Sequence, residues 1–546
     1  MGSQLHTIDY LVFLVYFVGV AGYGYWIYRR KQNNQESAAA FFLAEGALTW
    51  WAIGASLIAS NISAEQFIGM SGSGFAMGLA IASYEWMAAA TLLVVAVFFL
   101  PVYLRNRIYT MPQFLAQRYS PLVATIMAVF WLVVYVFVNL TSILYLGALA
   151  VSTVSGFSFT ACVVFLAIFA VLITLGGMKV IGYTDVVQVL VLIVGGLATT
   201  YLALNLVAQH FGAQGAWSGL RLLHEQADSH FHMIFSPGQM MMPDGKGGQE
   251  DAYGKMPGLA VLFGAMWIAN LSYWGFNQYI TQRALGADLK TARAGLLFAA
   301  CLKLLMPIIV VLPGIAAYVL HQQGYFQIEM ADAGVVKPDR AYPVLLNLLP
   351  AGLKGLSFAA LTAAIVASLA GKANSISTIF TLDLYKKYFN TGADEATQVR
   401  IGRIAIVVAM TIGALVAPAL ANFGQAFQFI QDFTGLISPG VVAIFLLGFF
   451  WKRATARAAL VGALATIPTG LLLEQVFAGM PFLHRMGWVF LILVGIMVLV
   501  SLLDPKSKTQ KNTIEVDTAD FRTETGFTIG MVLVLAVLAV LYYIFW

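Results

Sequence analysis

Residues 50–88 decide the fold of this chain, and they read WWAIGASLIASNISAEQFIGMSGSGFAMGLAIASYEWMA. The first part is apolar enough to enter a bilayer, but polar side chains interrupt it between Ser60 and Gln66. A glycine-rich turn and a second apolar stretch with Glu85 follow. Because hydrocarbon offers polar groups no water, such an interruption persists only beside protein or a water-filled cavity. The stretch therefore predicts a broken membrane helix that binds a ligand; the alternative is a helix-packing interface of small residues.

The composition of the chain places it in a membrane. Of its 546 residues, 60% are hydrophobic and only 10% are charged, whereas a soluble protein has about 25% charged residues. Recurrent apolar runs of about 20 residues predict membrane helices rather than a barrel. Both cysteines, Cys162 and Cys301, fall inside these runs, which argues against a disulfide framework.

The apolar runs predict an all-α integral membrane protein with about fourteen transmembrane helices. These spans are expected near residues 8–28, 50–71, 80–104, 122–150, 157–175, 183–208, 258–280, 293–320, 355–385, 399–419, 427–450, 455–476, 484–503 and 526–546. Arginines and lysines are concentrated in alternate loops, beginning with Arg29, Arg30 and Lys31 after the first span. By the positive-inside rule, the basic loops are cytoplasmic and both termini are extracytoplasmic.

The longest hydrophilic segment, residues 209–257, is then expected outside the membrane. It contains His230 and His232, a pair of residues that metal sites use. Two histidines without further ligands are more typical of an ordinary surface loop, and we interpret the segment in that way.

A second interrupted span lies at residues 258–280, where Asn270, Ser272, Asn277 and Gln278 stand inside an apolar run. The two interrupted spans are the second and the seventh, so each would open a group of five helices. Two such groups with broken first helices are the signature of inverted-repeat secondary transporters. A channel could also break helices around a filter, but no ring-forming filter repeat is evident. The sequence also shows no phosphate-binding glycine loop, zinc pattern or nucleophile elbow, which argues against an enzyme.

Several motifs resemble the sodium/solute symporter family, and its sugar-transporting branch most of all. They are GASLIASNISAEQFIGMSGSG, ASYEWM, GGMKVIGYTDVVQ, ANLSYWGFNQYITQR, LKLLMPIIVVLPGIAAYV and GQAFQFIQDFTGLISPG. The resemblance implies a leucine-transporter-type core of two inverted five-helix repeats with broken first helices. The expected parts are a leading helix and cytoplasmic loop (1–49), a first repeat (50–208), an extracytoplasmic loop (209–257), a second repeat (258–450) and three trailing helices (451–546).

A sugar needs carboxylate, amide and amine groups around an aromatic platform. Asn270, Tyr273 and Trp274 share one helical face through i, i+3, i+4 spacing, and Glu85 and Lys303 are opposite charges within separate spans. Because an isolated ion in a bilayer is costly, Glu85 and Lys303 are expected to meet, directly or across a bound hydroxyl. The alternative for this pair is a structural salt bridge.

The resemblance implies a role for each candidate residue. The expected sugar-binding residues are Gln66, Glu85, Asn270, Trp274, Lys303 and Gln431. The expected gate residues are Tyr273 with its partner Asn61 on the inner side, and Met70, Tyr84 and Phe427 on the outer side. Ala88 stands where the family's galactose-transporting pattern has serine, which removes one hydroxyl contact and leaves the identity of the sugar open.

The resemblance also implies a sodium site as the coupling site, with no other cofactor. Its expected ligands are the carbonyls of Ala59, Ile62 and Ala364 and the hydroxyl of Ser368, with Asp185 near the cytoplasmic exit route. Two residues depart from the family pattern: Ala367 replaces a usual serine, and Lys372 adds a cation one turn beyond Ser368. Lys372 is too deep for ordinary snorkelling. We expect Asp185 to be its partner; the alternative is a lysine solvated by the inner vestibule.

The sequence therefore predicts a sodium-coupled symporter of a monosaccharide that works by alternating access. A nearer alternative is a proton-coupled or uncoupled sugar carrier in which Lys372 replaces the cation. A more distant one is a sensor that kept the transporter fold. The expected location is the plasma membrane, the inner membrane in a bacterium, and the expected partners are the sugar, sodium and lipid, with no nucleic acid or obligate protein partner.

Overall fold

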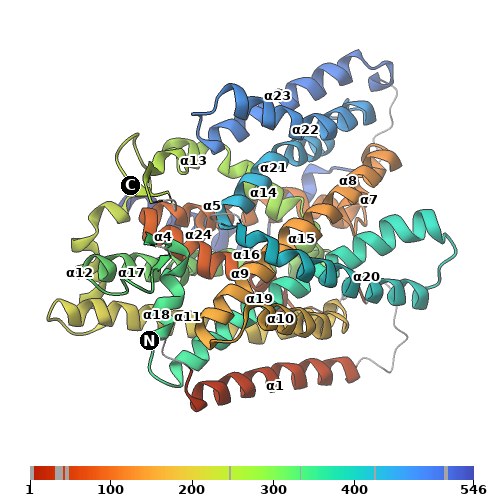
Figure 1. Ribbon diagram of the computed structural model, residues 1–546. Helices are drawn as coiled ribbons and strands as arrows, with labels where there is room; N and C mark the ends of the chain where they lie inside the picture. The colour runs from red at the N-terminus through yellow and green to blue at the C-terminus, as the bar shows by residue number, and fades with distance from the viewer. Residues whose placement is uncertain are drawn as a thin grey trace.

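The computed structural model describes residues 5–30, 41–42, 48–244, 247–332, 334–422, 426–508 and 514–546. These residues form a helical bundle, shown in Figure 1 with α1 at one edge and α22 and α23 at the opposite edge. Strands occur in two short antiparallel hairpins, formed by β1 (Met241–Pro243) with β2 (Gln249–Asp251) and by β3 (Ala331–Asp332) with β4 (Val335–Val336). The predicted all-α membrane architecture is confirmed.

The elements of the first half of the chain are α1 (Thr7–Arg30), α3 (Trp50–Asn61), η1 (Glu65–Met70), α4 (Ser71–Met77), η2 (Gly78–Ala82), α5 (Ser83–Val94), η3 (Val95–Phe99), α6 (Leu100–Arg105), α7 (Met111–Arg118), α8 (Pro121–Val133), η4 (Val134–Leu140), α9 (Thr141–Ser155), α10 (Phe159–Thr174), α11 (Met178–His210), α12 (Ala216–Gln226), η5 (Asp228–Phe231) and η6 (Ala252–Gly254). Of these, η1, η3 and η4 are π-helical turns within longer helices.

The elements of the second half are α13 (Leu259–Phe263), α14 (Met266–Gly275), α15 (Gln278–Leu285), α16 (Leu289–Val310), α17 (Leu312–Gln322), η7 (Pro338–Arg340), α18 (Ala341–Asn347), α19 (Leu353–Thr378), η8 (Ile379–Phe389), α20 (Glu395–Val416), η9 (Ala417–Asn422), α21 (Ala426–Phe450), α22 (Ala456–Val476), α23 (Phe482–Leu503), η10 (Pro505–Lys508), η11 (Thr518–Phe521) and α24 (Thr525–Ile544).

The predicted number of fourteen spans is not confirmed. By length and apolar composition, eleven helical stretches of the described residues could cross a membrane, or twelve if a bent helix pair counts as one span. The difference has a local cause near the first break. The helix that begins at Trp50 ends after 12 residues, and the 41 residues from Glu65 to Arg105 count as one stretch. Within that stretch Gly78, with φ 75° and ψ −148°, ends α4, so the backbone does leave the helical conformation at the predicted glycine-rich turn.

The first predicted helix break is present, and the polar residues of the sequence create it. Helix α3 ends at Asn61, and Ile62 adopts an extended backbone with φ −79° and ψ 113°. The side-chain carbonyl of Gln66 then accepts hydrogen bonds from the Ser63 amide at 2.9 Å and the Ser63 hydroxyl at 3.2 Å. The Ser63 hydroxyl in turn accepts from the Glu65 amide at 3.1 Å. These side chains satisfy backbone groups that a broken helix would otherwise leave without partners.

The second predicted break is also present. Helix α14 ends at Gly275, and Asn277 is extended with φ −111° and ψ 124° before α15 begins at Gln278. A further bend of 73° separates the stretch Ala252–Phe263 from α14. Both interrupted spans thus place irregular backbone at a depth where it must be enclosed by protein or line a cavity.

The broken helix α3 lies at the centre of the bundle. It packs against α11, α15, α16 and α19, and ten of its 12 residues are buried. Its approach to α16 depends on two glycines, because a Cβ at Gly54 would meet the Gly295 carbonyl oxygen at 2.7 Å. Small residues at such crossings allow close helix packing in membranes. The last helix α24 packs against α5 and α16, which carry Glu85 and Lys303.

The segment 209–257 folds over one end of the bundle as α12, η5 and the first hairpin. His230 is buried there; its Nε2 lies 3.2 Å from the Phe75 carbonyl, and its ring stacks on Tyr318 at 3.9 Å. Burial lowers the pKa of His230 to about 4, so that this side chain is neutral. His232 instead contacts the Trp546 carbonyl at 2.9 Å. Among the described residues, no group of three or more His, Cys, Asp or Glu could hold a metal ion.

Candidate functional site

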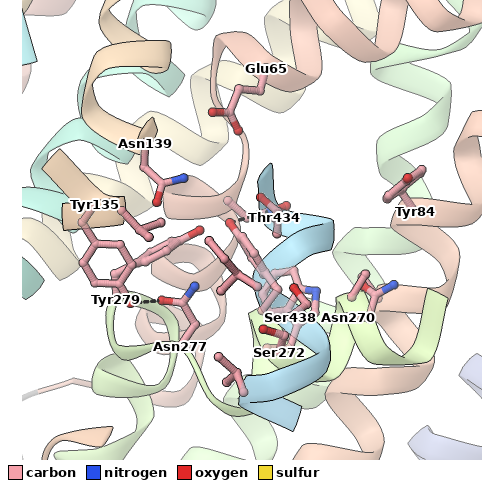
Figure 2. A pocket seen from close by; sticks show the side chains of 18 of the residues that line it. Glu65, Tyr84, Tyr135, Asn139, Asn270, Ser272, Asn277, Tyr279, Thr434 and Ser438 are labelled. Carbon is pink, nitrogen blue, oxygen red and sulfur yellow. Dashed lines mark hydrogen bonds between the residues drawn. The ribbon is translucent and has the colours of Figure 1, made fainter. Parts of the chain in front are cut away.

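A cavity of about 140 Å³ lies between the two helix breaks (Figure 2). Side chains from α3, η1, α5, α8, η4, α14, α15, α16 and α21 line it. Nine residues that the sequence analysis assigned to sugar binding or to gates line this single cavity: Asn61, Gln66, Met70, Tyr84, Glu85, Asn270, Tyr273, Trp274 and Lys303. Ala88, which departs from the family pattern, lines it as well. The side chains of the other two, Phe427 and Gln431, lie outside the described residues.

The two charged candidates meet, as predicted. Lys303 forms a salt bridge with Glu85 and also donates a hydrogen bond to the Asn61 side-chain oxygen. The Lys303 and Glu85 side chains are only 1% and 4% exposed. The ammonium also lies 5.0 Å from the centre of the Trp274 ring. An ion pair at this depth carries a large desolvation cost, which favours a functional role over simple stabilisation.

The aromatic and amide candidates surround this ion pair. The Asn61 amide donates to the Tyr273 hydroxyl at 2.9 Å, which confirms the predicted contact. The Asn270 amide nitrogen is bonded within its own helix to the Met266 carbonyl at 3.0 Å. Gln66 uses its carbonyl in the turn at Ser63. Asn270 can therefore present an acceptor to a ligand and Gln66 a donor, and two such groups suit the hydroxyls of a sugar.

The sequence analysis assigned no site role to several further polar residues of the cavity, which Figure 2 labels: Glu65, Tyr135, Asn139, Ser272, Asn277, Tyr279, Thr434 and Ser438. Tyr135 donates to the Asn277 side chain, and Ser142 donates to Glu65 at 3.1 Å. The π-helical turns η1 and η4 carry Glu65, Tyr135 and Asn139. A π-helical turn rotates the side chains that follow it, so ordinary helical spacing does not reveal which face these residues occupy.

The two helices that carry the residues predicted to bind sodium pack together beside the first break. Helix α19 packs against α3, and Ala59, Ile62, Ala364, Ala367 and Ser368 are all buried. The Ser368 hydroxyl donates to the Ser60 carbonyl at 3.0 Å, between the expected ligands Ala59 and Ile62. Hydroxyl and carbonyl oxygens near an unwound helix are the groups that transporters use to coordinate sodium.

The predicted pairing of Lys372 with Asp185 is wrong. Asp185 pairs instead with Arg283, whose Nη2 lies 3.8 Å from its carboxylate, and it accepts from the Ser56 hydroxyl at 2.5 Å. Lys372 donates to the Ser368 hydroxyl at 3.3 Å and lies 4.9 Å from the centre of the Tyr279 ring. Lys372 is only 1% exposed, so it is not solvated by a vestibule either. The Lys372 ammonium therefore lies against a hydroxyl that the sequence analysis assigned to sodium.

Comparison with known proteins places this fold among transporters. The profile of the "Sodium:solute symporter family" matches residues 41–466. The "Sodium/glucose cotransporter" of Vibrio parahaemolyticus is 45% identical over 99% of both chains. The human "Sodium/myo-inositol cotransporter 2" is 33% identical and covers 85% of this chain and 69% of its own length.

A solved structure supports the fold class. The chain resembles a Na⁺-coupled sialic acid symporter in a substrate-bound outward-open state, with a TM-score of 0.77 and 22% identity over 91% of this chain and 98% of the other. The fold is thus the leucine-transporter type that the family resemblance implies. Since the family profile spans most of the chain and a 45% identical relative aligns over almost all of it, this multi-pass membrane protein belongs to the sodium:solute symporter family.

Proposed function

We propose that this protein is a sodium-coupled symporter of a monosaccharide that works by alternating access. The buried Glu85–Lys303 pair, which lines a cavity together with amides and Trp274, is the observation that carries this proposal. Two charges held in a membrane interior mark a substrate pathway. The names of the relatives, a glucose and a myo-inositol cotransporter, point to a neutral polyhydroxylated substrate of similar size.

In this proposal the ion pair supplies both kinds of hydrogen-bonding group that a sugar needs. Glu85 accepts from sugar hydroxyls, and Lys303 donates to them. Asn270, Gln66 and Gln431 add amide contacts. Trp274 offers an apolar face to the C–H side of the ring, and it already lies 5.0 Å from the Lys303 ammonium. Tyr273, fixed by Asn61, closes the inner side of the site, while Met70, Tyr84 and Phe427 close the outer side.

Sodium binds in this proposal between α3 and α19, with oxygens from Ala59, Ile62, Ala364 and Ser368. A cation that bridges these two helices holds them in one arrangement, and the same arrangement fixes the break that carries Asn61 and Gln66. Sodium therefore improves the sugar site without touching the sugar. Such coupling is reciprocal, so the sugar must strengthen sodium binding by the same factor.

A second candidate function is a sugar carrier that does not use sodium. One observation favours it: the Lys372 ammonium contacts Ser368 at 3.3 Å, where a sodium ion would sit. A tethered cation at that place could hold α3 and α19 together permanently. We prefer the first candidate because both relatives named above are sodium cotransporters.

Uptake into proteoliposomes distinguishes the two functions. We expect radiolabelled hexose to accumulate above its equilibrium level only when an inward sodium gradient is imposed. Equimolar potassium or choline in place of sodium is the control, and excess unlabelled hexose should compete. Equal uptake with and without sodium would support the uncoupled carrier, and no hexose uptake under any gradient would contradict both functions.

The proposed location is the plasma membrane, the inner membrane in a bacterium, with both termini outside. Helix α1 begins and α24 ends at the same end of the bundle as α12 (Figure 1), which fits two termini on the side of the segment 209–257 that is expected outside. A single cysteine at the exposed Gln249 should react with an impermeant thiol reagent added to whole cells, and one at the exposed Lys506 should not. Cell lysis should make Lys506→Cys react, and the reverse pattern in whole cells would overturn the orientation.

A further inference from the structure

Arg283 connects four helices at one point deep in the bundle. From α15, its Nε donates to the Ser56 hydroxyl of α3 at 2.8 Å, and its Nη2 lies 3.8 Å from the Asp185 carboxylate of α11. Its Nη1 donates to the Tyr279 carbonyl within α15. The Arg283 and Asp185 side chains are each only 1% exposed. The guanidinium is therefore enclosed by protein and bound on several sides.

The fourth helix, α19, provides the space for this guanidinium through Gly371. A Cβ at position 371 would lie 2.5 Å from the Arg283 Nη2 and 2.8 Å from the Ser60 hydroxyl. Both distances are shorter than van der Waals contact, so any side chain at 371 would displace the end of Arg283. The absence of a side chain at Gly371 thus allows Arg283 to dock between α3, α11 and α19.

This docking point lies directly on the cytoplasmic side of the proposed cation site. Ser56 precedes Ser60 on α3 by four residues, about 6 Å along the helix axis. Several buried polar atoms there make no hydrogen bond within the described part of the chain: the Ser60 hydroxyl, one Asp185 oxygen, the Arg283 Nη2 and the Gln188 amide. Buried polar atoms without partners are rare and need a functional reason, and a route for a cation past Arg283 would supply one.

We propose that Arg283 is the cytoplasmic gate of the cation route. Asp185 and Ser56 hold this gate closed, and the absence of a side chain at Gly371 leaves space for the guanidinium. The inference rests on the proposed sodium coupling. The guanidinium must leave Asp185 before a cation from the Ser60–Ser368 region can reach the cytoplasm. Because Arg283 sits on α15, behind the second helix break, its release also lets α15 move away from α3 and α11, which opens the inner side.

A buried cysteine behind this gate tests the proposal. Gln188 lies three residues further along α11 than Asp185, about 4.5 Å deeper in the membrane, and it is only 1% exposed. We would introduce Gln188→Cys into a Cys162→Ala, Cys301→Ala background and measure its reaction with a small charged thiol reagent added to inside-out vesicles without sodium. We expect Gly371→Ala to raise this rate about ten-fold, since opening the gate shifts the population toward the inward-open form. Gly495→Ala is the matched control, because a Cβ at Gly495 meets nothing within 4 Å.

A second reporter separates a gate from general loosening of the fold. Tyr84 lines the cavity and is one of the proposed outer gate residues, so the reaction of Tyr84→Cys from outside should become slower when Gly371→Ala favours the inward-open form. Arg283→Gln should reproduce both changes if Gly371→Ala does not fold. The proposal would be overturned if Gly371→Ala and Arg283→Gln leave both labelling rates as in the parent. It would also be overturned if both Gln188→Cys and Tyr84→Cys are labelled faster. Labelling is measured without sodium or sugar. A failure of the gate proposal can therefore be distinguished from a failure of the proposed sodium-coupled uptake.

Discussion

Lys303→Ala should abolish hexose uptake while the protein still inserts in the membrane. The substitution leaves the Glu85 carboxylate buried without its cation, and Glu85 is only 4% exposed at its side chain. Removing one partner of a buried ion pair costs about 3–5 kcal/mol, which corresponds to about two to four decades in an equilibrium constant. It also removes the donor to Asn61, which positions Tyr273. Glu85→Ala should be equally severe, and initial uptake rates corrected for membrane expression measure both.

The double variant Glu85→Gln, Lys303→Met distinguishes a sugar site from a structural salt bridge. It removes both charges together, so no unpaired ion is left in the bundle and thermal stability should return toward that of the parent. Uptake should stay abolished, because a sugar then lacks its charged partners. Arg221→Ala breaks an exposed ion pair with Glu225 and is the control, with parental uptake expected. Recovery of uptake in the double variant would show that the pair is structural.

The chemistry of the central cavity could be predicted from the sequence because charge and amides inside an apolar span are rare and costly. Glu85, Lys303 and Asn61 stand out for that reason, and the structure brings them into contact. The two helix breaks could be predicted on the same ground. None of these inferences needed the exact rotation of a helix, only the fact that polar groups in hydrocarbon must find one another.

Pairings that depend on helix rotation could not be predicted. Several basic residues could pair with Asp185 according to the sequence, and Lys372 was predicted from its position one turn beyond Ser368. In the structure Arg283 pairs with Asp185 instead, and its guanidinium occupies the space that Gly371 leaves open. That selection depends on where α15 restarts after Asn277, a three-dimensional property that linear spacing does not contain. The π-helical turns act in the same way at Glu65 and Asn139. The span count differs because the residues from Glu65 to Arg105 count as one stretch, although the backbone leaves the helical conformation at Gly78.

Lys372→Met should lower the sodium concentration required for half-maximal uptake by about ten-fold or more. The Lys372 ammonium lies 3.3 Å from the Ser368 hydroxyl, and Arg283 already holds Asp185, so this carboxylate does not neutralise the lysine. At about 6 Å and an effective dielectric constant of 20, one positive charge opposes sodium by about 3 kcal/mol, or about two decades in affinity. Ala367→Ser should shift the same value in the same direction, since it restores an oxygen at a buried position one turn from Ala364.

Lys354→Met is the matched control for Lys372→Met, because Lys354 is also buried on α19 but stands about five turns away. It should leave the sodium dependence unchanged. If Lys372→Met also leaves it unchanged, the ammonium does not compete with sodium. If uptake by the parent and both cation-site variants ignores sodium, the coupling proposal is wrong. A response of the parent to an imposed pH gradient, lost in Lys372→Met, would then identify Lys372 as the group that takes the place of sodium, because it is the buried cation that touches the Ser368 hydroxyl.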